Sequence, residues 1–273
     1  MNDLKRFWVV AVLAGAALLS PLAHAGRSCA APHPPRAETV ERGLNLAERT
    51  LKALDNSGAQ VVLLARAGQD LSKYGLRYSH LGLAYQQSDG HGGHVWRVLH
   101  KLNQCGTAES AIYRLGLGEF FLDDLWRYEA AWVVPAPDVQ RRLLALVQDE
   151  PRAVQMHHKP YSLVSYAWGQ KYQQSNQWAI ETLALAMAPE MATKRPTRTQ
   201  AQAWLQGQGY QPSVLKISAV TRLGARVSAA NVAFDDHPSE KRFADRIETV
   251  TVDSVFTWLG RAGLAQAPVT LAP

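Results

Sequence analysis

The alternation of apolar and polar residues along the chain predicts five helices. Apolar residues recur at helical spacing over 38–54, and Asp55-Asn56-Ser57-Gly58 ends that segment. Pro137-Asp138 begins a second helix that runs to about 147. The strongest pattern covers 174–187, where a polar start leads into a mainly apolar run. Shorter helices are predicted over 200–205 and 253–259.

Short apolar runs bounded by turn residues predict the strands. The clearest pair covers 77–85 and 94–102, which are joined by a glycine-rich hairpin loop over 88–93. Further strands are predicted over the ranges 60–64, 132–134, 214–217 and 248–252. Because these strands and helices do not alternate regularly, the fold class is expected to be α+β.

The first residues have the features of a secretion signal. Lys5 and Arg6 precede an uncharged apolar run over 7–19, and Ala23-His24-Ala25 has the small-x-small pattern that a signal peptidase cuts. The apolar run is too short for a comfortable bilayer crossing. We therefore expect a signal peptide over 1–25, cleavage after Ala25, and a periplasmic or secreted protein.

The composition is that of a globular protein and points to no particular cofactor. Apolar residues make up 47% of the chain, charged residues make up 19%, and the formal net charge is +6. The densest basic piece, 194–198, is expected to be a solvated loop, so no nucleic acid is expected as a partner. His91 and His94 lie in the glycine hairpin without a third ligand in view, and no metal or cofactor is predicted.

The chain has two cysteines, Cys29 and Cys105, and both lie after the predicted cleavage site. In an oxidising compartment such a pair is most simply one disulfide. The alternative is that Cys105 is a free catalytic thiol.

Three places have residues suited to nucleophilic catalysis: His80 within an apolar strand, His100 near the end of the next strand, and Ser175-Asn176-Gln177 at the start of the 174–187 helix. A nucleophile at a helix start lies beside free backbone N–H groups that stabilise an oxyanion, and a strand histidine can act as its base. The alternatives are that Ser175 and Asn176 only cap the helix and that His80 is a core histidine.

These places together resemble a known superfamily. Ser79-His80-Leu81-Gly82 looks like the strand motif of the circularly permuted NlpC-like, papain-related superfamily, which includes lecithin:retinol acyltransferase-like enzymes. Lys159-Pro160-Tyr161 and the 174–187 helix follow in the expected order, and the similarity covers roughly 58–187. The resemblance implies a papain-like antiparallel sheet packed on helices, with His80 as base, His100 as its orienting residue and Ser175 at the nucleophile position. The mature chain also resembles a secreted proteobacterial family of unknown function.

Two hypotheses of function follow from this resemblance. In the first, an exported hydrolase or acyl or peptidyl transferase uses Ser175, His80 and His100 on an amide or ester. In the second, the scaffold is catalytically silent and binds a cell-wall peptide, a lipid or an envelope protein. The superfamily has a cysteine where this chain has Ser175, and an alignment shifted by one residue would place Asn176 there.

For either hypothesis, Asn176, Gln177, Tyr161 and Trp168 are the expected ligand-binding residues. The core domain is expected over 26–190, with 191–273 as a C-terminal extension packed on it. The sequence does not indicate the oligomeric state.

Overall fold

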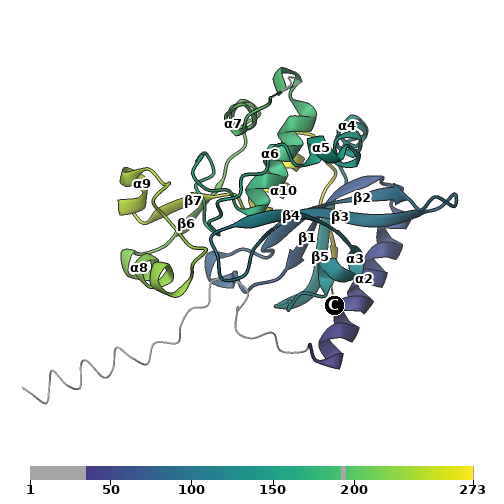
Figure 1. Cartoon of the computed structure of the whole chain (residues 1–273), viewed down its shortest axis with the longest axis horizontal. Coiled ribbons are helices and arrows are strands. Elements are labelled where there is room, and N and C mark those ends of the chain that lie inside the picture. Colours follow the sequence, from purple (N-terminus) through teal and green to yellow (C-terminus); the bar gives the residue numbers. More distant parts are fainter. Residues whose placement is uncertain (1–34, 192–194, 273) are drawn as a thin grey trace, which may run out of the picture.

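A six-stranded antiparallel sheet forms the centre of the protein (Figure 1). The computed structural model describes residues 35–191 and 195–272. The strand order is β4-β3-β2-β1-β5-β8. The strands are β1 Val61–Ala67, β2 His80–Ser88, β3 His94–Asn103, β4 Ser110–Gly116, β5 Arg127–Val133 and β8 Val269–Leu271.

Helices cover both faces of this sheet. Alternate residues of β1 point to opposite faces: Leu63 joins one apolar cluster and Leu64 joins the other. On the Leu64 side lie α2 Ala37–Asn56 and α3 Leu117–Phe121. On the Leu63 side lie α4 Pro137–Gln148 and α6 Ser175–Met187, in one cluster with α10 Val252–Arg261. α6 is buried on all sides from Ser175 to Leu185, as expected for a central helix.

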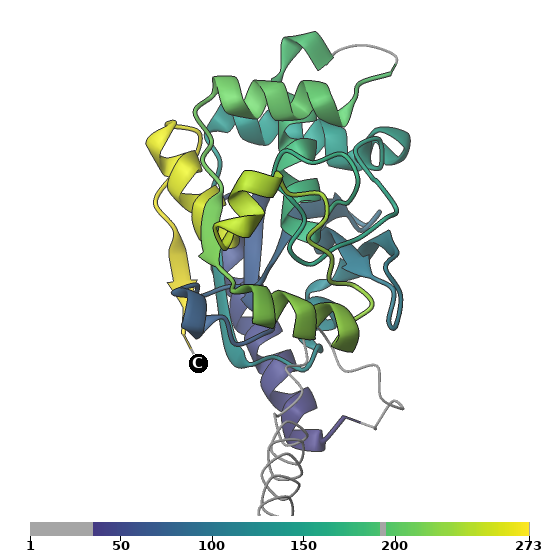
Figure 2. The same ribbon diagram turned by 90° about the vertical axis from the view of Figure 1, so that its left-hand side faces the viewer.

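The C-terminal part forms a smaller sheet with its own apolar cluster. β6 Ser213–Lys216 pairs with β7 Arg246–Thr249, and α8 Ala219–Ser228 and α9 Ser239–Phe243 lie beside them. Figure 2 views the molecule from the end at which α8 and α9 lie. The remaining elements are α5 Glu150–Ala153, α7 Arg198–Gly207 and the 3₁₀ turns η2 Ser72–Tyr74 and η3 Pro189–Met191.

The α+β class and the antiparallel sheet packed on helices are confirmed. The strongest patterns predicted α2, α6 and the β2–β3 hairpin to within a few residues. The strands β4 and β8 and the helices α3, α8 and α9 were not predicted. In residues 35–191 and 195–272, no helix combines the length and apolar character that a bilayer crossing requires.

Candidate functional site

His80 and His100 lie side by side on neighbouring strands. His80 begins β2, and His100 lies towards the end of β3. Nε2 of His80 is 2.9 Å from Nδ1 of His100, which makes a direct hydrogen bond between the two imidazoles. Both side chains are buried, and the rings meet edge to face. The structure therefore brings together the two histidines that the sequence selected.

The two imidazoles point to the face of the sheet covered by α3. The ring of Phe120 in α3 lies 5.9 Å from the His80 ring and 5.3 Å from the His100 ring, between centroids. Arg66, which pairs with His80 across β1 and β2, places its guanidinium over the same phenyl ring and forms an ion pair with Asp123. The histidine pair is therefore enclosed by an aromatic ring and a cation.

This environment keeps both histidines neutral. Burial, and after it the Arg66 cation, lowers the pKa of His100 to about 3. Burial, Arg66 and the neighbouring imidazole lower the pKa of His80 well below its usual range. Nε2 of His100 is buried without a hydrogen-bond partner in the described part of the chain. A base with such a low pKa holds a proton poorly at neutral pH.

Gly82 has no side chain, and this leaves room for the packing of the Phe120 and His100 side chains. A Cβ at this position would clash with Cγ1 of Val98, and it would lie 3.3 Å from Cε2 of Phe120 and 3.5 Å from Cβ of His100. The glycine after the histidine in Ser79-His80-Leu81-Gly82 therefore serves close packing between β2, β3 and α3.

The start of α6 lies on the opposite face of the sheet from the histidine pair. Ser175 is the first residue of the helix, and within the described residues its side-chain hydroxyl bonds only to the Tyr161 hydroxyl, at 3.5 Å. Gln174 caps the helix, and its side-chain carbonyl accepts the N–H of Asn176 at 2.8 Å. The expected hydrogen bond between Ser175 and His80 is not present. Ser175 contacts Tyr161 on the side of the sheet to which Lys101 points, whereas the His80 and His100 rings contact Phe120 on the other side.

Asn176 is the residue of α6 that reaches the histidine strand. The ladder between β2 and β3 ends at the pair Leu83 and Leu99, so the N–H of Leu81 beyond it has no partner on β3. Asn176 Oδ1 accepts this N–H at 2.9 Å, and its Nδ2 donates to the Ser79 carbonyl at 3.4 Å. Asn176 therefore holds the backbone on both sides of His80.

The other predicted ligand-binding residues are mostly enclosed. Gln177 and Tyr161 are buried, and Trp168 is half-buried against the ring of Tyr210. Gln177 accepts a hydrogen bond from Ser165 and donates to the carbonyls of Tyr166 and Ala167. Burial raises the pKa of Tyr161. Through its hydrogen bonds, Gln177 holds the 161–174 loop against α6.

Residues 231–250 of the C-terminal part close this region from outside. The Ser162 hydroxyl donates to the Ala233 carbonyl, and Asp236 accepts the N–H of Tyr166 at 2.7 Å. Gln174 Nε2 donates to the Val250 carbonyl, so the cap of α6 is itself held by the residue after β7. The extension thus covers the helix start that the sequence predicts to be an active site.

A buried ionic network on α6 was missed by the sequence analysis. Glu181 is fully buried and accepts two hydrogen bonds from Arg198, of 2.7 and 3.1 Å, and a third from Gln202. Gln173 connects Glu181 to Lys101, whose pKa burial lowers to about 6. The prediction of a solvated basic loop over 194–198 is thus wrong for Arg198, which begins α7 and is buried.

The remaining candidate residues lie apart from the histidine pair. His94 bonds to Asp55 at the base of the hairpin, and His91 is exposed in the hairpin loop. Cys105 lies in the turn between β3 and β4, whereas Cys29 lies outside the described residues, so their pairing stays a prediction. The predicted signal peptide also lies outside them. In the described part, His, Cys, Asp and Glu side chains form no cluster of three that could hold a metal ion.

Comparison with known proteins places the chain in a family but does not supply an activity. No curated protein and no solved structure matches it, so the resemblance to NlpC-like proteins has no structural counterpart. A family model matches residues 53–259, about three quarters of the chain. The matched part contains the histidine pair, α6 and residues 231–250. The chain therefore belongs to the family described as uncharacterized protein conserved in bacteria (DUF2145).

Proposed function

We propose that this protein is an exported binding protein of the cell envelope, built on a catalytically silent scaffold of the papain-like type. The observation that carries the proposal is the position of Asn176, whose side-chain amide occupies the contact between the α6 start and the histidine strand. A carboxamide cannot act as the nucleophile of acyl transfer. The same residue instead gives the strand a structural anchor.

The surroundings of Ser175 also favour a silent scaffold. Activation of a serine needs a base within hydrogen-bond distance, because its hydroxyl must lose a proton during attack. The partner of Ser175 is the Tyr161 hydroxyl, and burial raises the pKa of that phenol. A neutral phenol is a poor base, so it does not prepare Ser175 for attack.

The backbone N–H of Asn176 at the helix start is used as well. An oxyanion hole needs N–H groups directed at an open position where charge develops. The N–H of Asn176 is bonded to Gln174, which is held in turn by the Val250 carbonyl. Residues 231–250 would have to move away before a substrate could reach Ser175.

The hydrolase hypothesis has one observation in its favour, the direct bond between His80 and His100. It requires the imidazole of His80 to reach the opposite face of the sheet. It also requires residues 231–250 to move away from the start of α6. The two hypotheses therefore differ in a measurable way, which is the reactivity of the Ser175 hydroxyl.

A fluorophosphonate probe tests this reactivity. Purified protein of residues 26–273 would be labelled beside Ser175→Ala and His80→Ala, with a known serine hydrolase in the same sample as a positive control. Phenylmethylsulfonyl fluoride would be used in parallel, since it enters narrower sites. We expect no adduct at Ser175 by peptide mass mapping. An adduct at Ser175 that is lost in both variants would establish an activated serine and refute the proposal.

Export is tested separately by fractionating the producing bacterium and sequencing the N-terminus of the protein recovered. We expect a periplasmic or secreted chain that begins at Gly26. A full-length chain in the cytoplasm would contradict the envelope location and leave the probe result unaffected.

A further inference from the structure

The helix α8 presents its apolar side to solvent. Val220, Leu223 and Val227 are spaced by three and four residues, so they share one face of the helix. Their exposed fractions are 83, 66 and 84%. Phe243, at the end of the neighbouring helix α9, is 74% exposed. Contiguous exposed apolar side chains of this kind mark interaction surfaces.

The inner side of α8 has the opposite character. Arg222 is buried and donates hydrogen bonds to the Ile217 carbonyl and to Asp245 Oδ1. Ala225 packs beside it on the apolar cluster around Phe234. The helix therefore anchors itself through a guanidinium and a small side chain, and its larger aliphatic side chains are left outside. This is the reverse of an ordinary surface helix.

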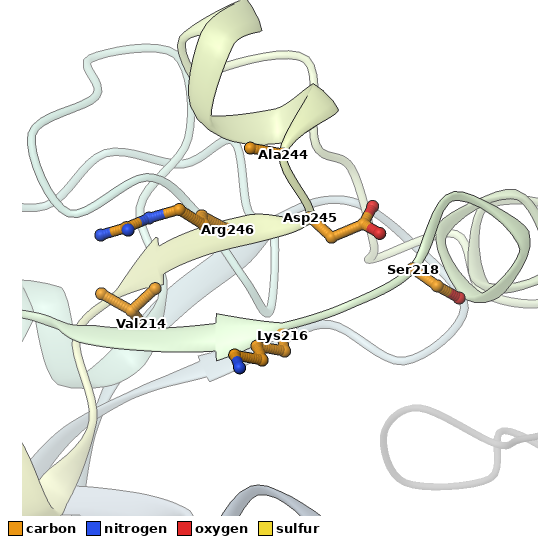
Figure 3. Close-up of a pocket in the computed structure, with 6 residues that line it drawn as sticks. All are labelled: Val214, Lys216, Ser218, Ala244, Asp245 and Arg246. Carbon is orange, nitrogen blue, oxygen red and sulfur yellow. The ribbon is translucent and has the colours of Figure 1, made fainter.

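Cations without carboxylate partners lie beside this apolar face. Lys216 on β6 stands directly opposite Arg246 on β7, and both are exposed (Figure 3). Arg226 borders the apolar face on α8 itself and is also exposed. Among the residues that the structure describes, none of these three cations has an ion pair. Like charges directly opposite on a strand pair repel, and an anion between them relieves this repulsion.

The hollow that holds two of these cations adjoins the start of α8 and the end of α9. Lys216 and Arg246 line a shallow hollow whose other walls include Ser218, the N-cap of α8, and Ala244, which follows Phe243 (Figure 3). Asp245 also lines the hollow, but its carboxylate is paired with Arg222 at 2.6 Å. The apolar residues of α8 and Phe243 thus begin at the edges of a cationic hollow.

We propose that this surface, defined as Val220, Leu223, Val227, Phe243, Lys216, Arg226 and Arg246, docks the protein on an anionic phospholipid bilayer. α8 would lie flat at the interface with its aliphatic side chains among the acyl chains, over a length of about 15 Å. Lys216 and Arg246 would meet the lipid phosphates. Charge complementarity favours a lipid surface over a second copy of the chain, because the cations of two copies would repel one another.

The inference extends the proposed binding function by naming a partner, and it uses a surface separate from Ser175 and the histidine pair. A vesicle measurement and the fluorophosphonate measurement can therefore fail independently. Reactivity at Ser175 would leave the docking surface in place, and absence of lipid binding would leave the silent α6 site in place.

Vesicle co-sedimentation tests the proposal. Residues 26–273 would be mixed with vesicles of phosphatidylcholine containing phosphatidylglycerol, and with vesicles of phosphatidylcholine alone. We expect binding to the anionic vesicles that weakens with salt, and much weaker binding to the neutral ones. Removing both cations in Lys216→Gln/Arg246→Gln is expected to weaken binding by about fivefold for each charge.

A second variant removes the apolar contacts. Val220→Ser/Leu223→Ser/Val227→Ser is expected to reduce binding to anionic vesicles at least about tenfold, because buried aliphatic area contributes to interfacial binding. Val154→Ser and Lys52→Gln serve as controls, because both residues are exposed outside the proposed docking surface. These two variants should bind the anionic vesicles as the natural protein does. Thermal unfolding would verify that every variant is folded.

Three outcomes would overturn the proposal. The first is no binding to either vesicle. The second is a lack of specificity: either anionic and neutral vesicles bind the protein equally well, or the surface variants and the control variants lose the same amount of vesicle binding. The third is concentration-dependent dimerisation in sedimentation velocity that is lost in the apolar triple variant, which would assign the surface to a second copy of the chain.

Discussion

The buried pair of histidines should make the protein unstable in mild acid, and His100 allows the size of the effect to be worked out. In the unfolded chain a histidine takes up a proton near pH 6.5. In the folded protein His100 does so only near pH 3, because burial and Arg66 oppose its charge. Between these two pH values the unfolded state binds more protons, so the free energy of unfolding falls as the pH falls.

At pH 5 the loss from His100 alone is about 2 kcal/mol, and it approaches about 5 kcal/mol below pH 3. His80 contributes with the same sign, because its pKa is lowered by the same burial. For a domain whose total stability is about 5–15 kcal/mol, losses of this size move the unfolding midpoint clearly.

Urea unfolding between pH 4.5 and 7.5, followed by tryptophan fluorescence, measures this dependence. In His100→Asn the side chain retains a group near the Nδ1 position that bonds to His80, but it no longer titrates. We expect the slope of unfolding free energy against pH to fall by about 1.2 kcal/mol per pH unit over pH 4.5–6. The substitution also alters the packing on Phe120, which changes the unfolding free energy at every pH. The slopes against pH are therefore compared, and not the free energies themselves.

His91→Asn is the matched control, because it makes the same substitution at an exposed hairpin position. It should leave the slope as in the natural protein. An unchanged slope in His100→Asn would refute the reasoning, since it would mean that this imidazole already takes up its proton in the folded state at mildly acidic pH.

Three further substitutions probe the packing of the same region. Gly82→Ala should destabilise the fold by about 1–3 kcal/mol through overpacking, whereas Gly260→Ala, in open space on a helix, should be neutral or stabilising; chemical denaturation compares the two. Asn176→Ala leaves the buried N–H of Leu81 without its partner, at a cost of about 1–3 kcal/mol, and also removes the longer bond to the part-buried Ser79 carbonyl; faster amide exchange at Leu81 would reveal it. Glu181→Ala leaves Arg198 buried without its anion and should cost about 3–5 kcal/mol, and thermal unfolding unchanged from the natural protein would contradict this.

The sequence was sufficient to locate the main elements because their patterns are local. The helix over 38–54 and the hairpin over 77–102 follow from apolar spacing and from the glycine-rich loop between strands. His80 and His100 could be selected for the same reason, because two strands joined by a short hairpin must pair. Their hydrogen bond forms just beyond the end of that ladder, which stops at Leu83 and Leu99.

The face of the sheet on which the histidines lie could not be determined in this way. His80 alternates with Leu81 and Leu83, but β2 is buried on both faces, so alternation does not say which helix covers which side. Which residue of α6 contacts the histidine strand could not be determined either. It depends on where the β2–β3 ladder ends, which is a tertiary property.

Short-range periodicity was enough to predict the α+β class, the two histidine-bearing strands and the central helix. The tertiary structure alone decided that the sheet separates Ser175 from the imidazoles, and that residues 231–250 cover the helix start. It also decided that α8 turns Arg222 inward and its aliphatic side chains outward. Burial depends on which surfaces meet after the chain folds, and periodicity specifies the faces of an element without specifying their partners.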